Sequence, residues 1–163
     1  MTPGAAGSAE EFSAFVRQHG RGLDRLAYLM LGDEQAAEDL AAEVLLAVWR
    51  QWNRVKETDY PVAYVRRIMV NHASAHFRRN AKERRGLAHL MVLMSRQAHQ
   101  PDSAAVVDTR AALLRLPPRR RACLVLRFAF DLTEREVAET LGISVGTVKS
   151  LTSKAVAQFR REI

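Results

Sequence analysis

The stretch TEREVAETLGISVGTVKSLTSK, residues 133–154, predicts two short helices joined by a tight turn. Thr133 and Glu136 have the spacing of a capping box, in which the threonine hydroxyl caps the Glu136 amide and the glutamate reaches back. Gly142 suits a left-handed turn because it has no side chain to clash there. Ser144 is placed to cap the second helix. The pattern therefore predicts a helix-turn-helix near the end of the chain.

The two helices of this motif divide into an apolar side and a polar side. The residues expected to pack between them are Val137, Ala138, Leu141, Val148, Leu151 and Ala155. A polar and basic helix face can enter the major groove of DNA, where lysine reads guanine edges and hydroxyl groups bond bases or phosphates. The candidate DNA-contacting residues are Arg135, Ser144, Gly146, Thr147, Lys149, Ser150, Ser153 and Lys154. A helical hairpin with a merely solvated polar face is the competing interpretation.

Helical periodicity also dominates the rest of the chain, and the alternation typical of strands is absent. Ser8 is expected to cap a first helix that ends at Gly32, and Asp33 to open a second. Pro61 fits the first turn of a third helix, and this helix or a pair of helices runs to about Arg79. The apolar positions of the second helix are Ala37, Leu40, Val44, Leu45, Val48, Trp49 and Trp52.

Residues 81–105 predict a linker with room for a short helix, because they combine charged and turn-forming residues with a short apolar patch, Leu87–Met94. We therefore expect an all-α protein of two small helical domains, residues 8–80 and 106–163, joined by a flexible linker.

The composition points to nucleic acid and away from the membrane. Net charge is +7 over 163 residues, distributed as −4 in residues 1–60, +7 in residues 61–100 and +4 in residues 101–163. A basic C-terminal part of a chain typically binds a polyanion, and an acidic N-terminal part suggests a second partner. The single cysteine, Cys123, allows no intrachain disulfide, which fits a cytoplasmic protein, and we expect it to be buried. Residues 1–8 lack the apolar core of a signal peptide, and no apolar run is long enough to span a membrane.

The motifs of the second half resemble domain 4 of extracytoplasmic-function sigma factors, a group of the sigma-70 family. These motifs are LPPR at 116–119, LR at 126–127, LTEREVA at 132–138, LG at 141–142 and GTVKS at 146–150. Leu151 departs from the family, which frequently has arginine there.

The first half is similar to region 2 of the same family, and the chain looks nearest to its SigE-like members. The matching segments are AEDL at 37–40, EV at 43–44, VW at 48–49 and AYVRRI at 63–68, with Asn71, Arg78 and Arg79. Ala42 departs from the family, which usually has glutamine at that position.

The resemblance implies an RNA polymerase sigma factor that recognises promoters, melts DNA and initiates transcription. The resemblance to region 2 implies that Glu38, Asp39 and Glu43 contact the polymerase. These residues form an acidic helix surface suited to a basic partner. Stabilisation of the helix start is the alternative interpretation for Asp33 and Glu34, and it explains Asp39 and Glu43 less well because they lie further along the helix.

The resemblance also implies that region 2 holds the melted minus-ten element. Cations, planar groups and aromatic rings can recover the cost of unstacking bases. The candidates are Tyr64, Arg66, Arg67, Asn71, His72, Arg78 and Arg79. A buried role remains open for Tyr64, and a solvated linker remains open for the basic run at 78–85. The helix-turn-helix would then read the minus-thirty-five element.

The resemblance implies core RNA polymerase, promoter DNA and an anti-sigma protein as partners. We expect no enzyme activity and no cofactor: His72 and His76 lie one helical turn apart, but a third metal ligand is missing nearby. Two alternatives stay open. One is a stand-alone helix-turn-helix regulator that binds paired half-sites as a dimer, and the other is an adaptor that binds polymerase without reading DNA.

Overall fold

The computed structural model describes the backbone of residues 3–95 and 104–163, and the side chains of residues 6–79 and 108–163. Within these ranges the chain is helical and contains no strand, so the predicted all-α class is confirmed. The helices are α1 (Pro3–Leu31), α2 (Glu34–Arg50), α3 (Trp52–Lys56), α4 (Pro61–Ser95), α5 (Ala104–Arg115), α6 (Pro118–Phe128), α7 (Glu134–Leu141) and α8 (Val145–Glu162).

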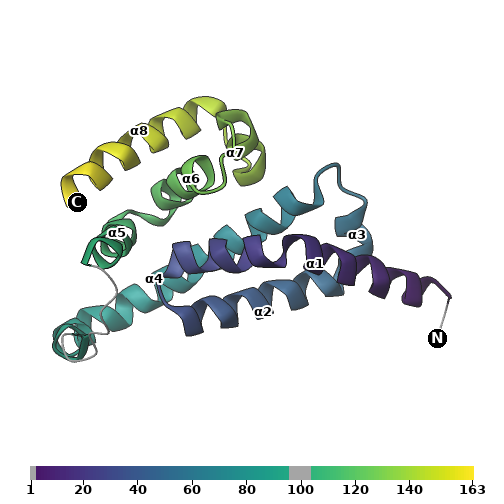
Figure 1. Ribbon diagram of the computed structural model, residues 1–163, viewed down its shortest axis with the longest axis horizontal. Coiled ribbons are helices and arrows are strands. Elements are labelled where there is room, and N and C mark those ends of the chain that lie inside the picture. The colour runs from purple at the N-terminus through teal and green to yellow at the C-terminus, as the bar shows by residue number, and fades with distance from the viewer. Residues whose placement is uncertain (1–2, 96–103) are drawn as a thin grey trace.

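Helices α1 to α4 form a first helical unit, in which α1, α2 and α4 lie side by side (Figure 1). Gly32 ends α1 in a left-handed conformation with φ of 73°, and its amide donates to the carbonyl of Tyr28 at 2.7 Å. Asp33 then caps α2 by accepting from the amide of Ala36 at 2.8 Å, as predicted. The fully buried core of this unit includes Leu26, Val44, Val48, Val65 and Met69.

The start of α1 differs from the prediction. The helix begins at Pro3 rather than after Ser8, whose hydroxyl instead donates to Oδ1 of Asn53 at 3.0 Å. Proline fits a first helical turn and the alanines that follow it are strong helix formers, so the helix extends beyond the expected cap.

The end of the second predicted helix also differs. The chain turns at Gln51, so α2 ends at Arg50 and Trp52 begins α3. Trp52 is buried as expected, whereas Trp49 is 42% exposed. The ring of Phe12 contacts both tryptophans, with its centroid 5.2 Å from that of Trp49 and 5.4 Å from that of Trp52. Trp52 also contacts the ring of Phe15, whose centroid lies 5.3 Å from its own.

Helix α4 begins at Pro61, as predicted, but continues to Ser95 instead of stopping near Arg79. A glycine inside a helix, here Gly86, costs only about 1 kcal/mol, and its neighbours are mostly strong helix formers. The side chains of the apolar patch Leu87–Met94 lie outside the described residues. The domain boundaries at 80 and 106 therefore stay predictions.

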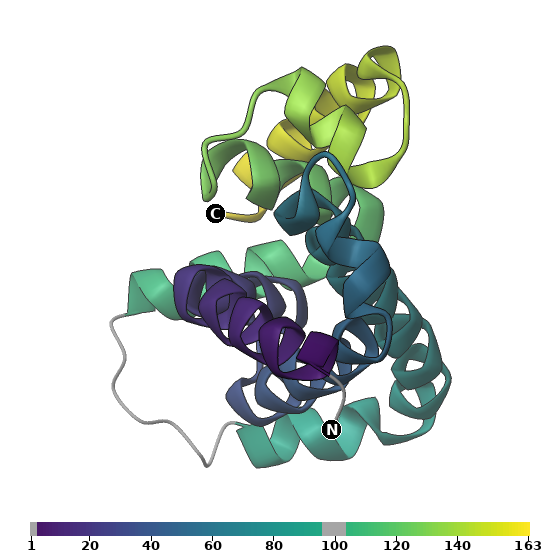
Figure 2. The same cartoon turned by 90° about the vertical axis from the view of Figure 1, so that its right-hand side faces the viewer.

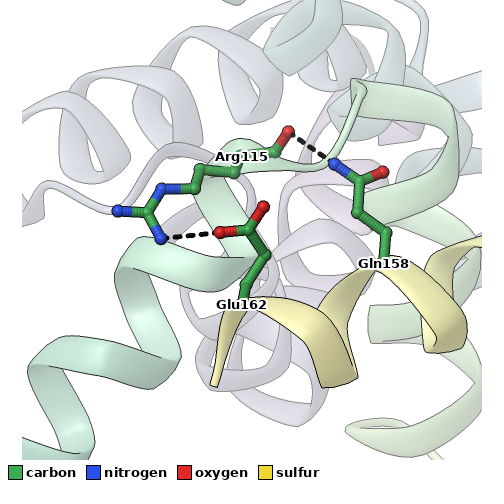
Figure 3. Close-up of polar contacts among 3 residues, drawn as sticks. All are labelled: Arg115, Gln158 and Glu162. Atoms are coloured by element: carbon green, nitrogen blue, oxygen red, sulfur yellow. Dashed lines mark hydrogen bonds and ion pairs between the residues drawn. The ribbon is translucent and has the colours of Figure 1, made fainter.

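Helices α5 to α8 form a second unit around a small core of Leu116, Leu124 and Ala155. The two ends of this unit are joined by polar contacts between α5 and α8 (Figure 3). Nη1 of Arg115 lies 2.8 Å from Oε2 of Glu162, and Nε2 of Gln158 donates to the Arg115 carbonyl at 3.3 Å. These contacts make α5 part of the second unit.

The two units pack against each other through α1 and α4 on one side and α5, α6 and α7 on the other (Figures 1 and 2). Buried apolar residues from both units form one continuous cluster, which runs from Phe15 of α1 to Val148 of α8. In the free chain the two units are therefore packed together, which is its closed form.

A buried arginine stands at the junction of the two units. Arg121 of α6 is 1% exposed, and its guanidinium lies 5.0 Å above the ring of Phe77 in α4. The carbonyls of Leu113, Leu114 and Leu116 accept from it at 2.8 to 2.9 Å. The Met30 carbonyl of α1 accepts a further hydrogen bond. These carbonyls lie at or just beyond the ends of α5 and α1, where helix dipoles favour a cation.

Replacing Arg121 with methionine should lower the free energy of unfolding by at least about 3 kcal/mol, because four carbonyl groups lose their charged donor. Urea denaturation followed by circular dichroism measures the change. Arg119→Met is the matched control, since Arg119 is an exposed residue of the same helix. Equal denaturation midpoints for the two variants would contradict this role of Arg121.

Candidate nucleic-acid interface

The helix-turn-helix has the local geometry that its sequence predicts. The Glu136 amide donates to Oγ1 of Thr133 at 3.1 Å, and the Thr133 amide donates to Oε2 of Glu136 at 2.7 Å. Gly142 adopts the left-handed conformation with φ of 67°, and the Thr147 amide donates to Oγ of Ser144 at 3.1 Å. Both helix starts and the turn between them are therefore fixed by local hydrogen bonds and backbone conformation.

Helix α8 separates its two faces clearly. Val148 and Ala155 are fully buried, which agrees with the predicted packing side. Leu151 is half-buried and packs against the core, so at this position a packing role replaces the arginine frequent in the family. The predicted DNA-facing residues of the motif are all exposed: Arg135, Ser144, Gly146, Thr147, Lys149, Ser150, Ser153 and Lys154.

Two of these exposed cations face carboxylates of α7. Nζ of Lys149 lies 3.9 Å from Oε2 of Glu134, and Nε of Arg135 lies 3.9 Å from Oε1 of Glu139. Long, exposed pairs of this kind contribute at most about 1 kcal/mol and are easily exchanged. Both cations therefore remain available to a phosphate or a base.

A second polar surface lies on α4. Asn71, His72, Arg78 and Arg79 line a shallow pocket of about 520 Å³ together with Glu43 of α2. Nδ1 of His72 lies 3.2 Å from Oε1 of Glu43. The structure thus brings together four of the seven residues predicted for the minus-ten element, and it places one predicted polymerase-binding residue beside them.

The other three residues of that prediction lie elsewhere on α4. Tyr64 is half-buried and packs against the core, which is the alternative that the sequence left open. The guanidinium of Arg66 lies over the ring of Phe130 at 5.4 Å from its centroid. Arg67 is exposed, but its guanidinium faces the turn at Gly142.

Burial lowers the pKa of Arg66 from its usual value, and the nearby carboxylate of Glu136 in α7 partly offsets this. Burial also lowers the pKa of His19, and the charge of Arg66 lowers it further. Arg66 therefore lies in a crowded, cationic part of the junction between the two units, where Glu136 is the nearby opposite charge.

The acidic surface on α2 contains more than the predicted carboxylates. Glu38, Asp39 and Glu43 are exposed, and Leu46 and Trp49 on the same helix are 50% and 42% exposed. Positions 39, 43 and 46 follow helical spacing and so share one face. Leu46 was not predicted from the sequence, although its position two residues from the buried Val44 and Val48 places it on the opposite side of the helix. Ala42 is exposed on this surface too.

Groups able to hold a metal ion are absent from the described side chains. Likewise, none of the described helices is sufficiently long and apolar to cross a membrane. Cys123 is fully buried, as expected, and burial raises the pKa of its thiol to about 11. It therefore behaves as a small core residue.

Two family models match this chain, and they follow its two units. The sigma-70 region 2 model matches residues 15–83, and the sigma-70 region 4 model matches residues 107–159. Together they span both halves of the predicted organisation.

Curated relatives match along nearly the whole chain. The RNA polymerase sigma-E factor of Streptomyces avermitilis is 32% identical over 162 residues, which cover 98% of this chain and 88% of that protein. The sigma-E factor of Streptomyces coelicolor is 30% identical over 159 residues, with 96% and 88% covered. The ECF RNA polymerase sigma factor SigE of Mycolicibacterium smegmatis is 32% identical over 89% of this chain and 58% of its own length.

A solved structure supports the fold. The sigma factor RpoE of Bartonella quintana, crystallised with the anti-sigma factor NepR, superposes with a TM-score of 0.72 at 20% identity, covering 94% of this chain and 96% of that one. The predicted resemblance is thereby confirmed: the chain belongs to the extracytoplasmic-function group of the sigma-70 family and is an RNA polymerase sigma factor, a subunit that directs promoter recognition and transcription initiation.

Proposed function

We propose that three surfaces of this sigma factor divide its work, two of which meet at Glu43. The acidic face of α2 docks on core polymerase, the polar side of α4 holds the melted minus-ten element, and α8 reads the minus-thirty-five element in duplex form. Residues 8–80 and 106–163 would act as the two working domains. The observation that carries this proposal is the exposure of all eight predicted residues of the helix-turn-helix while its packing side is buried.

The docking surface combines carboxylates with apolar side chains. Interface centres are typically apolar and aromatic, with a charged rim that selects the partner. On α2, Leu46 and Trp49 supply the apolar part, and Asp39 and Glu43 supply the charge. A basic, partly apolar helical surface of the polymerase is the complementary partner.

The minus-ten surface offers the pocket that Asn71, His72, Arg78 and Arg79 line. An amide can hydrogen-bond the edge of an unstacked base, and the arginines can bind the phosphates on either side. Tyr60, which is 67% exposed just ahead of α4, adds an aromatic ring that the sequence analysis missed. Stacking on such a ring is worth about 1–3 kcal/mol per base.

The protein then acts by binding and positioning, with the chemistry of RNA synthesis left to the polymerase. We place it in the bacterial cytoplasm, where polymerase and promoter DNA are found, and we include an anti-sigma protein among its partners. Two domains held on one polymerase raise each other's effective concentration on DNA. Weak contacts at each element therefore suffice for a specific promoter.

Core polymerase supplied with this protein should start RNA chains at defined positions in a genomic fragment library, as mapped by sequencing the 5′ ends. A stand-alone regulator would instead bind its site without polymerase and would generate no new start sites. Start positions identical to those of core enzyme alone would contradict the proposal.

Reversing two charges on α2, with Asp39→Arg and Glu43→Arg, should abolish binding to core polymerase because two rim charges then repel the basic partner. The fold should survive, since both side chains are exposed and the pair of Glu43 with His72 is a surface contact. Co-purification with core enzyme measures binding. The control, Glu10→Arg with Glu57→Arg, makes the same change in charge at other exposed positions and should bind normally. Equal binding by both variants would rule out this docking surface.

Lys149→Ala should reduce transcription from a promoter that requires its minus-thirty-five element by roughly tenfold, since one base contact is worth about 1–3 kcal/mol. Run-off transcription with reconstituted holoenzyme measures this. Arg161→Ala, at the far end of α8, is the matched control and should leave output unchanged. Equal output from the Lys149 variant and the wild-type protein would remove this residue from the reading surface.

A further inference from the structure

Val145, the first residue of α8, carries an exposed apolar side chain at the end of the helix that faces DNA. Its side chain is 38% exposed, and it was not among the residues predicted for the minus-thirty-five element. In a helix-turn-helix, the first residues of the second helix are the ones that reach base edges. Positions 145 and 149 are four residues apart, so Val145 shares a helix face with Lys149. An aliphatic side chain therefore lies beside a lysine proposed to read DNA.

The hydroxyl groups on either side of Val145 are already used by the start of the helix. Oγ of Ser144 lies 2.8 Å from Oγ1 of Thr147, and it also accepts a hydrogen bond from the Thr147 amide at 3.1 Å. A cap of this kind stabilises the first turn, so a base must compete with it for both hydroxyl groups. Val145 can contact a base without any hydrogen bond being given up.

Gly146, the next residue, leaves space at the start of α8 that the fold itself does not need. A Cβ built there would meet Oγ of Ser144 at 3.9 Å, which is an ordinary contact, and the residue lies within the helix. Alanine is a better helix former than glycine, so the free protein would gain stability from a side chain here. Glycine instead lets the backbone approach another molecule closely. A side chain as short as that of Val145 can then reach the edge of a base.

The group that suits an aliphatic side chain in the major groove is the C5-methyl group of thymine. It is the one methyl group that the four bases display in that groove, and apolar side chains recognise thymine through it. Lysine, by contrast, reads the acceptor atoms of guanine. Val145 and Lys149 would therefore read neighbouring base pairs by different chemistry.

We propose that Val145 reads a thymine of the minus-thirty-five element by packing against its C5-methyl group, with Gly146 allowing the close approach. This inference rests on the proposed role of α8 as the reader of that element. It adds a specificity-determining residue and the kind of base pair that it selects. A guanine–cytosine pair at the same position would lack the methyl contact.

Replacing thymine with deoxyuridine removes the methyl group and keeps the base pairing, so it isolates this contact. In a promoter mapped with wild-type holoenzyme, the thymines of both strands of the minus-thirty-five region are replaced one at a time. Run-off transcription at limiting holoenzyme measures the output. For the wild-type protein, one replacement should reduce output by about fourfold, the effect expected from burying one methyl group. Val145→Ala should give equal output from the thymine and deoxyuridine templates at that position, which makes the comparison a double-mutant cycle.

Two further variants separate this contact from a change in the helix. Ile163→Ala removes an aliphatic side chain that is 66% exposed just beyond the other end of α8, and it should keep the fourfold discrimination. Gly146→Ala should unfold at the same temperature as the wild type or a higher one, as followed by circular dichroism. It should nevertheless lose both output and discrimination, because the added methyl group holds the helix start away from the DNA.

Discrimination by Val145→Ala as large as that of the wild-type protein overturns the proposal. A wild-type profile in which no single deoxyuridine lowers output does the same, and full discrimination by Gly146→Ala overturns the part given to close approach. Failure of the proposed function gives a different result, in which holoenzyme yields only the start sites of core enzyme and the inference falls with it.

Discussion

The closed form of this sigma factor depends on one buried guanidinium. Arg121 is a cation with almost no exposed surface, held by the carbonyl ends of two helices that belong to different units. Such a charge is tolerated only where its donors are satisfied, because an unpaired buried ion costs several kcal/mol. The end of α1, the end of α5 and the start of α6 are therefore positioned relative to one another by the geometry of a single planar side chain.

Around this fixed point the contacts between the units become progressively more exposed. Arg121 and the buried apolar cluster lie deepest, Phe77 and Phe130 are half-buried, and Arg67 meets the turn at the surface. Outer contacts of this kind are the ones that a competing partner such as a phosphate replaces most readily, because their net strength in water is small. These side chains are therefore the first that the two units would release on separating.

Local signals in the sequence predicted local structure well. The capping box at Thr133, the left-handed turn at Gly142 and the cap at Asp33 are all decided within four residues, and each is found as expected. The extended start of α1 and the continuation of α4 were not predicted. A single serine or glycine, here Ser8 and Gly86, does not end a helix when the neighbouring residues are good helix formers. The sequence also predicted two DNA surfaces, and the exposure of the helix-turn-helix residues agrees with that prediction.

The packing between the units could not be predicted, because it depends on contacts between residues roughly 45 to 100 positions apart in the chain. Nothing local distinguishes Arg121 from Arg119 and Arg120, yet it alone of the three is fully buried. The most direct test is the distance between spin labels on Ser13→Cys in α1 and Arg161→Cys in α8, measured by pulsed electron resonance. The account predicts a single, well-defined distance in the free protein and a distance longer by tens of ångströms in the complex with core polymerase and promoter DNA. The same distance in both states would contradict it.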